Sequence, residues 1–307
     1  MNSLIVDRDA PGGIRLATTT PVPLASEALV RVSAAAVNPT DLHFAAQAPH
    51  GAVIGYELAG TIEVPASDGS SPPAGTRVAG LAMGGAWAEY AAVPGAQLAV
   101  IPDHLDFDTA ATVPLAGASA LRALRALGPT LGRRVLITGA TGAVGKIAVQ
   151  LAAASGAAEI TAVARDEQAF PLLRDLGATS TSAVIGTDFG TFDGVIDNVG
   201  GSALRDAFAL LASNGTLVSV GRASGEDVVL SATDLQGDWG GSGRTIRTFF
   251  MPEEGGPDLR PDFEFLIHLA ATGRLHTNIG DRVSLSRGLD ILRTGAWTGK
   301  LVLQPHA

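Results

Sequence analysis

The sequence contains no cysteine. This absence excludes disulfide bonds, a cysteine nucleophile and every zinc site built on thiolates. Aromatic residues make up only 5% of the chain, and only Lys146 and Lys300 are lysines among its 21 basic residues. We find no apolar run long enough to cross a bilayer and no secretory signal pattern, so we expect a cytoplasmic protein.

Positive charge is also scarce. The chain has 21 basic against 30 acidic residues, a formal net charge of −9, and no basic cluster. This composition argues against nucleic acid or an anionic membrane surface as a partner. What is present is apolar: 46% of the 307 residues are hydrophobic, which is enough for a sizeable core in roughly two domains.

The pattern of the chain changes after about residue 112. Before it, short strand-like segments are bounded by glycine or proline, which predicts a β-rich, barrel-like domain. After it, helices and strands alternate, which implies parallel strands with crossover helices and an α/β fold. We expect strands at 135–138, 160–164, 194–197 and 216–220, and we expect a strand at 245–250 and a helix at 262–271 to complete the sheet.

The tail from Asp281 to Gln304 is expected to form a helix and then a strand, and to rejoin the first domain. The predicted domains are therefore 1–112 with 273–307, and 113–272.

Three glycines follow the predicted strand 135–138 and precede a helix-forming run. Gly139, Gly142 and Gly145 have the spacing of a loop that cradles a dinucleotide pyrophosphate. One glycine permits the tight turn, one lets the backbone approach phosphate, and one lets the helix pack on the strand. We predict dinucleotide binding; the alternative is a glycine-rich turn that only packs tightly.

The end of the next predicted strand favours NADPH over NADH. NAD sites place an acidic residue there to hold the ribose 2′-hydroxyl, and this chain has Ala164. Arg165 follows and can pair with a 2′-phosphate, unless it is only a solvated loop charge. Asp166 is a counter-signal, but we interpret it as a helix N-cap.

Several further stretches carry a family resemblance. They are Ala34–Asp41 (AAAVNPTD), Gly55–Gly60 (GYELAG), Gly85–Tyr90, Pro114–Ala120, Phe192–Gly200 and Thr298–Leu303. Together with the glycine loop they resemble the medium-chain dehydrogenase/reductase superfamily, in its zinc-free quinone oxidoreductase and enoyl reductase branch. The resemblance implies a GroES-like β-barrel domain, a Rossmann domain with the cofactor in the cleft between them, hydride transfer from a nicotinamide, and a homodimer.

Two departures from the zinc alcohol dehydrogenases of this superfamily indicate that no metal is bound. Those enzymes have cysteine where this chain has Asn38 and histidine where it has Tyr56. Neither replacement suits zinc. Without a Lewis acid, alcohol oxidation loses its usual mechanism. Reduction of a quinone or an α,β-unsaturated carbonyl compound is then favoured, because the resulting anion is stabilised and protonated.

The candidate catalytic residues each have a structural alternative. Asn38 is predicted to hydrogen-bond the nicotinamide ribose or the substrate, or it only forms an Asn-Pro turn. Tyr56 is predicted to donate to a developing oxyanion, or it only packs at the barrel edge. Several quinone reductases have a tyrosine at the position of His43, so the resemblance implies that His43 points at the substrate. The alternative is an ordinary loop histidine. The candidate cofactor contacts beyond the glycines and Arg165 are Ser119, Thr141, Ala143, Val144, Asn198, Val199, Gly221 and Arg222.

Two rival functions each fit part of the sequence. A short-chain dehydrogenase is rejected, because it needs a Tyr-x-x-x-Lys pair and the chain has Gly60 and Pro94 at the lysine offset from its two tyrosines. A non-catalytic NADPH-binding sensor, or a crystallin-like protein, stays open because no acid–base group is obvious. The sequence does not name the substrate.

Overall fold

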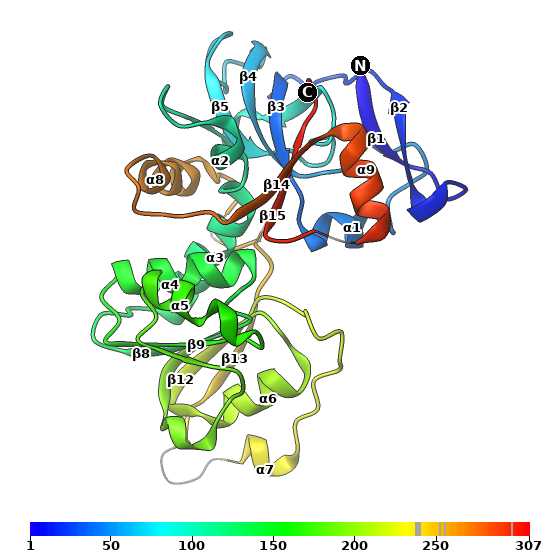
Figure 1. The fold of residues 1–307 in the computed structure, drawn as a ribbon. Coiled ribbons are helices and arrows are strands. Elements are labelled where there is room, and N and C mark those ends of the chain that lie inside the picture. The colour runs from blue at the N-terminus through cyan, green and yellow to red at the C-terminus, as the bar shows by residue number, and fades with distance from the viewer. Residues whose placement is uncertain (237–240, 252, 255, 296) are drawn as a thin grey trace. The chain divides into compact units, whose positions relative to one another are not determined.

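The computed structural model describes residues 1–236, 241–251, 253–254, 256–295 and 297–307. The chain forms two compact units (Figure 1). Unit 1 comprises Met1–Ala118 and Pro257–Ala307, and unit 2 comprises Ser119–Gly256. Unit 1 is therefore built from both ends of the sequence, and unit 2 is the segment between them.

Unit 1 is built on one large sheet and a separate strand pair. The sheet is antiparallel except that β14 pairs parallel to β15. In spatial order its strands are β14 (Ile279–Ser284), β15 (Lys300–Gln304), β3 (Glu27–Ala36), β4 (Glu57–Val64), β5 (Arg77–Leu81) and β7 (Leu98–Val100), with β6 (Tyr90–Pro94) also on β3. The pair is β1 (Asn2–Val6) and β2 (Ile14–Thr18).

A buried tryptophan fixes the chain that leads into β4. Trp87 is fully buried, and its ring N–H donates to the carbonyl of Ala36 at 3.3 Å. A Cβ on Gly55 would lie 2.2 Å from the Trp87 ring, and Gly55 has a φ of +91°. Only glycine fits there. The backbone that precedes Tyr56 is therefore held against the core.

The helices of unit 1 are short. They are η1 (Pro11–Gly13), α1 (Pro39–Ala45), η2 (Gly95–Gln97), α2 (Phe107–Ala111), α8 (Arg260–Ala271) and α9 (Leu285–Thr294). The tail from residue 279 thus forms a strand, a helix and a strand, and the final strand pairs with β3 as part of unit 1. The tail thus pairs with the first part of the chain, and β14 precedes the helix that we expected at its start.

Helix α8 corrects one expectation. We expected the 262–271 helix to complete the parallel sheet, but α8 belongs to unit 1 and packs against β5 and β7. Its buried face includes Phe263 and Leu266. At its start, Arg260 donates to the carbonyls of Gly95 and Ser70 at 2.6 and 2.8 Å. These contacts, which sequence periodicity does not encode, attach the helix to unit 1.

Unit 2 is a six-stranded parallel sheet with the strand order of the Rossmann fold. In spatial order the strands are β10 (Ser180–Ser182), β9 (Glu159–Val163), β8 (Arg134–Thr138), β11 (Phe192–Asp197), β12 (Leu211–Ser219) and β13 (Thr245–Thr248). The expected strands are confirmed, including β13 at the sheet edge. Leu136 and Ile196 on the central strands are fully buried, as parallel strands covered on both faces require.

The crossover helices of unit 2 cover both faces of its sheet (Figure 1). They are α4 (Ala143–Ala154), η3 (Glu167–Ala169), α5 (Phe170–Asp175), η4 (Thr187–Phe189), α6 (Gly201–Ala209) and α7 (Ala232–Leu235). Helix α3 (Pro114–Leu127) contains the division between the units, which falls after Ala118. Pro171 lies in the first turn of α5, where its missing N–H costs nothing.

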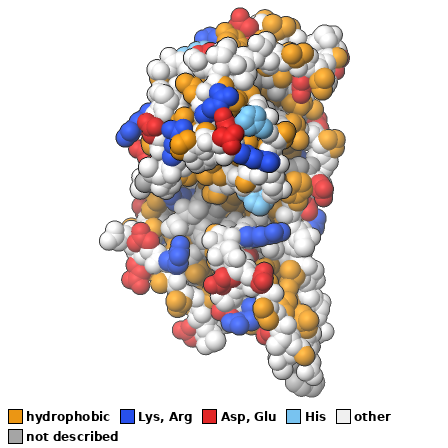
Figure 2. Space-filling view, turned by 90° about the vertical axis from the view of Figure 1, so that its right-hand side faces the viewer, with side chains coloured by type: hydrophobic (Ala, Val, Ile, Leu, Met, Phe, Trp, Pro, Cys, Tyr) orange, Lys and Arg blue, Asp and Glu red, His pale blue; other side chains and the backbone are white. Residues whose placement is uncertain are grey.

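The helices and the surface bear on two kinds of partner, a membrane and a polyanion. No helix among the described residues is long and apolar enough to cross a membrane. On the face drawn in Figure 2, basic and acidic side chains are interspersed rather than gathered by sign. This face gives no reason to expect a polyanion as the partner.

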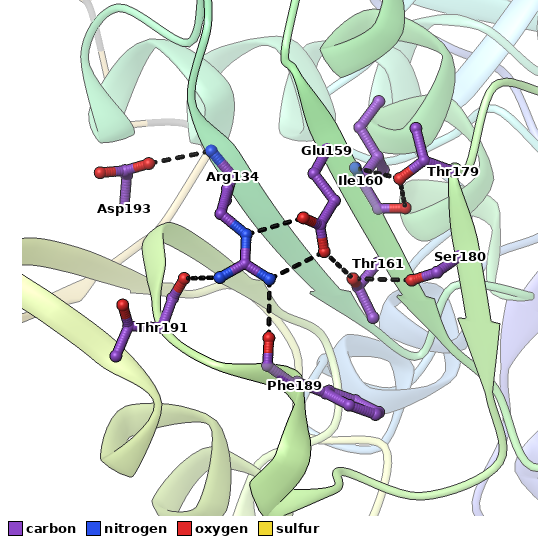
Figure 3. A network of polar contacts seen from close by, with 9 residues as sticks. All are labelled: Arg134, Glu159, Ile160, Thr161, Thr179, Ser180, Phe189, Thr191 and Asp193. Atoms are coloured by element: carbon purple, nitrogen blue, oxygen red, sulfur yellow. Dashed lines mark hydrogen bonds and ion pairs between the residues drawn. The ribbon is translucent and has the colours of Figure 1, made fainter.

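A polar network joins the strands of unit 2 at the end where they begin (Figure 3). The guanidinium of Arg134 on β8 donates to both carboxylate oxygens of Glu159 on β9, at 2.7 and 2.9 Å. It also donates to the carbonyls of Phe189 and Thr191, each at 2.6 Å, and lies over the ring of buried Phe192. One side chain thus ties two neighbouring strands to the segment that precedes β11.

We predict that Arg134→Met destabilises the protein by about 1–3 kcal/mol, because several charge-assisted hydrogen bonds are lost at once. Arg205→Met is the matched control, since Arg205 pairs with one exposed neighbour, Asp206. Its effect should be within about 0.5 kcal/mol. Denaturant unfolding of both variants checks this, and equal effects would contradict the role assigned to the network.

Candidate active site

The glycine loop between β8 and α4 is crowded in the way a phosphate cradle requires. Gly139 has a φ of +59°, which favours glycine, and Gly142 is the N-cap of α4. A Cβ on Gly145 would lie 2.4 Å from the carbonyl oxygen of Gly139 and 2.7 Å from the Cα of Ala140. The first turn of α4 therefore packs directly on the loop. Its free N–H groups and the positive end of the helix dipole suit an anionic group.

The loop after β11 is bonded to the end of β8. Asn198 donates from Nδ2 to the carbonyl of Thr138 at 2.9 Å. The carboxylate of Asp197 accepts from the Thr138 hydroxyl at 2.5 Å and from the N–H of Gly200 at 2.9 Å. Burial raises the pKa of Asp197, although these hydrogen bonds oppose the rise. Asp197 thus fixes the loop that begins with Asn198 and Val199.

The chain after β12 closes the same edge of the sheet. A Cβ on Gly221 would lie 2.4 Å from the carbonyl oxygen of Asn198, so this position also needs glycine. The N–H of Gly221 donates to the carbonyl of Asp197 at 3.1 Å. Arg222 follows with an exposed side chain. The predicted residues that follow β8, β11 and β12 therefore gather at the carboxyl edge, next to the point where the strand order reverses.

The end of β9 has the expected cap. The carboxylate of Asp166 accepts from the N–H of Gln168 at 3.0 Å, as the N-cap of η3. The prediction of an N-cap role for Asp166 is confirmed. Ala164 is buried and the Arg165 side chain is exposed. Ser119, the first residue of unit 2, is buried within α3.

In unit 1, Asn38 belongs to a buried polar cluster with Glu57 and Lys300. The Asn38 amide donates from Nδ2 to Glu57 Oε1 at 2.8 Å, and its Oδ1 accepts a hydrogen bond from the ammonium of Lys300. That ammonium lies 2.5 Å from Glu57 Oε1. The second carboxylate oxygen of Glu57 accepts from the N–H of Leu115 at 2.8 Å. The polar atoms of Asn38 thus bond within the protein.

Asp41 adds a second buried carboxylate beside this cluster. Its Oδ2 accepts from the backbone N–H of Asn38 at 2.6 Å, which caps the start of α1, and its Oδ1 has no hydrogen-bond partner. Burial, with a smaller effect of the Glu57 charge, raises the pKa of Asp41 to about 7, against the lowering effects of the Asn38 hydrogen bond and the Lys300 charge. Asp41 therefore gains or loses its proton near neutral pH.

Tyr56 lies beside α1 as part of a row of rings. The ring of Phe44 makes edge contacts with Tyr56 and with His43, with centroids 5.6 Å apart in each case. Nε2 of His43 is 3.0 Å from the amide nitrogen of Gln47. Partial burial, and secondarily the Asp41 charge, raises the pKa of Tyr56. Its hydroxyl is thus a neutral donor at ordinary pH.

A separate cavity of about 300 Å³ lies in unit 1. Leu42 and Ala45 of α1 line it together with Leu289 and Arg293 of α9. Asn38, His43 and Tyr56 do not line it. The described residues hold no group of three or more histidine or acidic side chains arranged as metal ligands.

Two family models match this chain. One, described as the alcohol dehydrogenase GroES-like domain, matches residues 25–103, and the other, described as zinc-binding dehydrogenase, matches residues 143–271. A solved mycobacterial quinone oxidoreductase is 26% identical, with a TM-score of 0.85 over 99% of this chain and 100% of its own. A mycobacterial protein solved with NADPH is 25% identical, with a TM-score of 0.84 over the same shares.

The chain belongs to the medium-chain dehydrogenase/reductase superfamily, in its quinone oxidoreductase branch. The GroES-like and Rossmann folds that the resemblance implied are confirmed. This assignment supports an oxidoreductase.

The curated relatives of this chain are proteins of very different lengths. Polyketide synthase GfsB of Streptomyces halstedii is 32% identical over 73% of this chain, which spans 4% of that protein. The 2-methylene-furan-3-one reductase of Solanum lycopersicum is 31% identical over 57% of this chain and 50% of its own length. The chain thus spans half or less of both relatives.

Sequence reasoning assigned no role to Asp41, Glu57 or Lys300. Each is buried; Glu57 and Lys300 bond residues that are distant in the sequence, whereas Asp41 bonds Asn38, which lies close by in the sequence. One signal was available: Lys300 is one of two lysines in a chain that otherwise uses arginine, and it precedes an apolar strand. Such a lysine is expected to be buried with a partner, but the partner cannot be read from the sequence.

We predict that Asp41→Asn raises the melting temperature relative to the native protein at pH 8 and raises it less at pH 5. Because the pKa of Asp41 is raised from 3.8 to about 7, the folded protein binds a proton that the unfolded chain has lost between these values. Native stability therefore falls as the pH rises through this window, and asparagine escapes that loss.

Asp234→Asn is the matched control, because Asp234 caps α7 in the same N3 position and is only partly buried. Its hydrogen bonds with Ser231 lower its pKa, so this variant should gain nothing at pH 8. Melting curves at both pH values decide; a difference for Asp41→Asn that is independent of pH would contradict the prediction.

Proposed function

We propose that this protein reduces a quinone or an α,β-unsaturated carbonyl compound with NADPH and without a metal. The observation that carries the proposal is the contact at Gly145, where a Cβ would collide with the backbone of the loop. A loop packed this closely against a helix N-terminus is the cradle that a dinucleotide pyrophosphate needs. The mycobacterial relative solved with NADPH supports the choice of a nicotinamide cofactor.

The residues after β9 support NADPH over NADH. The carboxylate of Asp166 caps η3 by accepting from the N–H of Gln168, so it is already engaged and is not the group that would hold a ribose 2′-hydroxyl. No carboxylate stands at Ala164, and Arg165 presents an exposed guanidinium, which suits a 2′-phosphate.

The donor set in unit 1 does not fit zinc. Asn38 Oδ1 and Glu57 Oε1 both contact the ammonium of Lys300, so a cation is already held between these oxygens. Tyr56 carries a neutral phenol, which is a poor zinc ligand. These contacts support a reduction that does not depend on a Lewis acid.

Bound NADPH supplies the hydride for this reaction. The residues of unit 1 must then stabilise the negative charge that appears on the oxygen of the acceptor and provide a proton. The neutral hydroxyl of Tyr56 is suited to that donation. The rings of Phe44 and His43, which meet at a steep angle beside Tyr56, offer aromatic edges and faces against which a conjugated acceptor can pack.

The names of relatives support both acceptor classes. Quinone oxidoreductases are among the similar solved structures, and the tomato relative is a reductase of a conjugated ketone. A panel of one quinone, one enone and one enoyl thioester, followed by the loss of NADPH absorbance, tests the proposal. Turnover of at least one is expected; tight NADPH binding with no turnover would instead support a non-catalytic sensor.

We predict that Arg165→Ala weakens NADPH binding about tenfold or more and changes NADH binding little, because it removes a charge-assisted contact with the 2′-phosphate. Titration of cofactor fluorescence measures both constants. Arg133→Ala is the matched control, since Arg133 is exposed just before β8, at the opposite end of the strand from the glycine loop. Equal losses for both cofactors would refute the assignment.

A further inference from the structure

Lys300 reaches the site from the last strand of the chain. Strand β15 pairs with β3 through Val302 and Ala36, and the N–H of Val37 donates to the carbonyl of Leu301 at 2.9 Å. This pairing brings Lys300 beside Asn38, where β3 leads into α1. The Lys300 side chain is 7% exposed and the Glu57 side chain is fully buried.

Lys300, Asn38 and Glu57 form a closed triangle of contacts, because each residue contacts the other two. Asn38 is the residue before α1, and Glu57 is the first residue of β4. The triangle therefore joins the helix that carries Phe44 to the strand that follows Tyr56. A buried carboxylate is tolerated only with a counter-charge and hydrogen bonds, and the ammonium supplies both.

The identity of the cation suits this position. Only two of the 21 basic residues are lysines, so the chain uses arginine at nearly every other basic position. The ammonium is a compact charge with three donors, whereas a guanidinium is a larger planar fork. Asn38 Oδ1 and Glu57 Oε1 both contact this cation in a buried site, which fits the compact ammonium better than a guanidinium.

We propose that Lys300 is a positioning residue: its ammonium ties the start of α1 to the start of β4 and thereby fixes the place of the Tyr56 hydroxyl. The proposal rests on the proposed function in taking Tyr56 as the donor to the reduced acceptor. Lys300 acts through Asn38 and Glu57, and its contact with both is what the structure shows.

The kinetic test compares Lys300→Met and Lys300→Arg with the native protein, using the acceptor that turns over fastest. Both variants should lose about tenfold or more in kcat while KM for NADPH stays within about twofold, because the alignment of Tyr56 is lost and the nucleotide cradle in unit 2 is untouched. A folded Lys300→Met variant with native kcat would overturn the proposal.

A charge-matched double variant separates positioning from a direct role. Glu57→Gln with Lys300→Met removes the ammonium together with the carboxylate that it contacts, and the amides at 38 and 57 can still pair. This variant should recover part of the kcat lost in Lys300→Met. If the recovery is absent although the double variant is folded, Lys300 does not act by joining these elements.

A spectroscopic test does not require turnover, so it distinguishes failure of this proposal from failure of the proposed function. The chain has only two tyrosines, Tyr56 and Tyr90, so ¹³C-tyrosine labelling gives two sets of ring signals. Lys300→Met should shift or broaden the Tyr56 signals and leave those of Tyr90 unchanged. Unchanged Tyr56 signals would overturn the proposal even in a fully active enzyme.

Discussion

Two carboxylates, Asp41 and Glu57, are buried together in unit 1 beside a single ammonium. Burying charge in this way is costly unless every group finds a partner, so the surrounding backbone is arranged to supply them. The N–H groups of Asn38 and Leu115 point at the two carboxylates, and Lys300 is brought in by the pairing of β15 with β3. The carboxylates thus determine where α1, β4 and the end of the chain meet.

This arrangement changes how the candidate residues of unit 1 are understood. Asn38, taken alone, is a polar side chain that can reach a ligand. In the structure its amide bonds Lys300 and Glu57, so its contribution is to connect elements. Tyr56 differs, because its ring contacts Phe44 and its hydroxyl is kept neutral by partial burial. Of the two, Tyr56 is the better candidate for direct contact with an acceptor.

Unit 2 depends on a different constraint, the close approach of backbone to backbone. At Gly145 and Gly221 a single methyl group would collide with a neighbouring carbonyl. The loops after β8, β11 and β12 are consequently packed together at one edge of the sheet, and Asp197 holds two of them through its hydrogen bonds. The Arg134 network joins β8 and β9 at the opposite end, where these strands begin. The sheet is therefore held together at the end that carries the glycine loop and at the end where its strands begin.

The sequence by itself determined the two folds, the parallel strands implied by alternating helices and strands, the glycine loop and the N-cap at Asp166. These features depend on local patterns, in which turn residues, apolar runs and caps act within a few positions of one another. Only the tertiary structure decided that α8 joins unit 1, since its partners Gly95 and Ser70 lie more than 160 residues away. The same holds for the contact of Lys300 with Asn38 across 262 residues. Burial selects such partners through space, and no local pattern records which charges will be enclosed together.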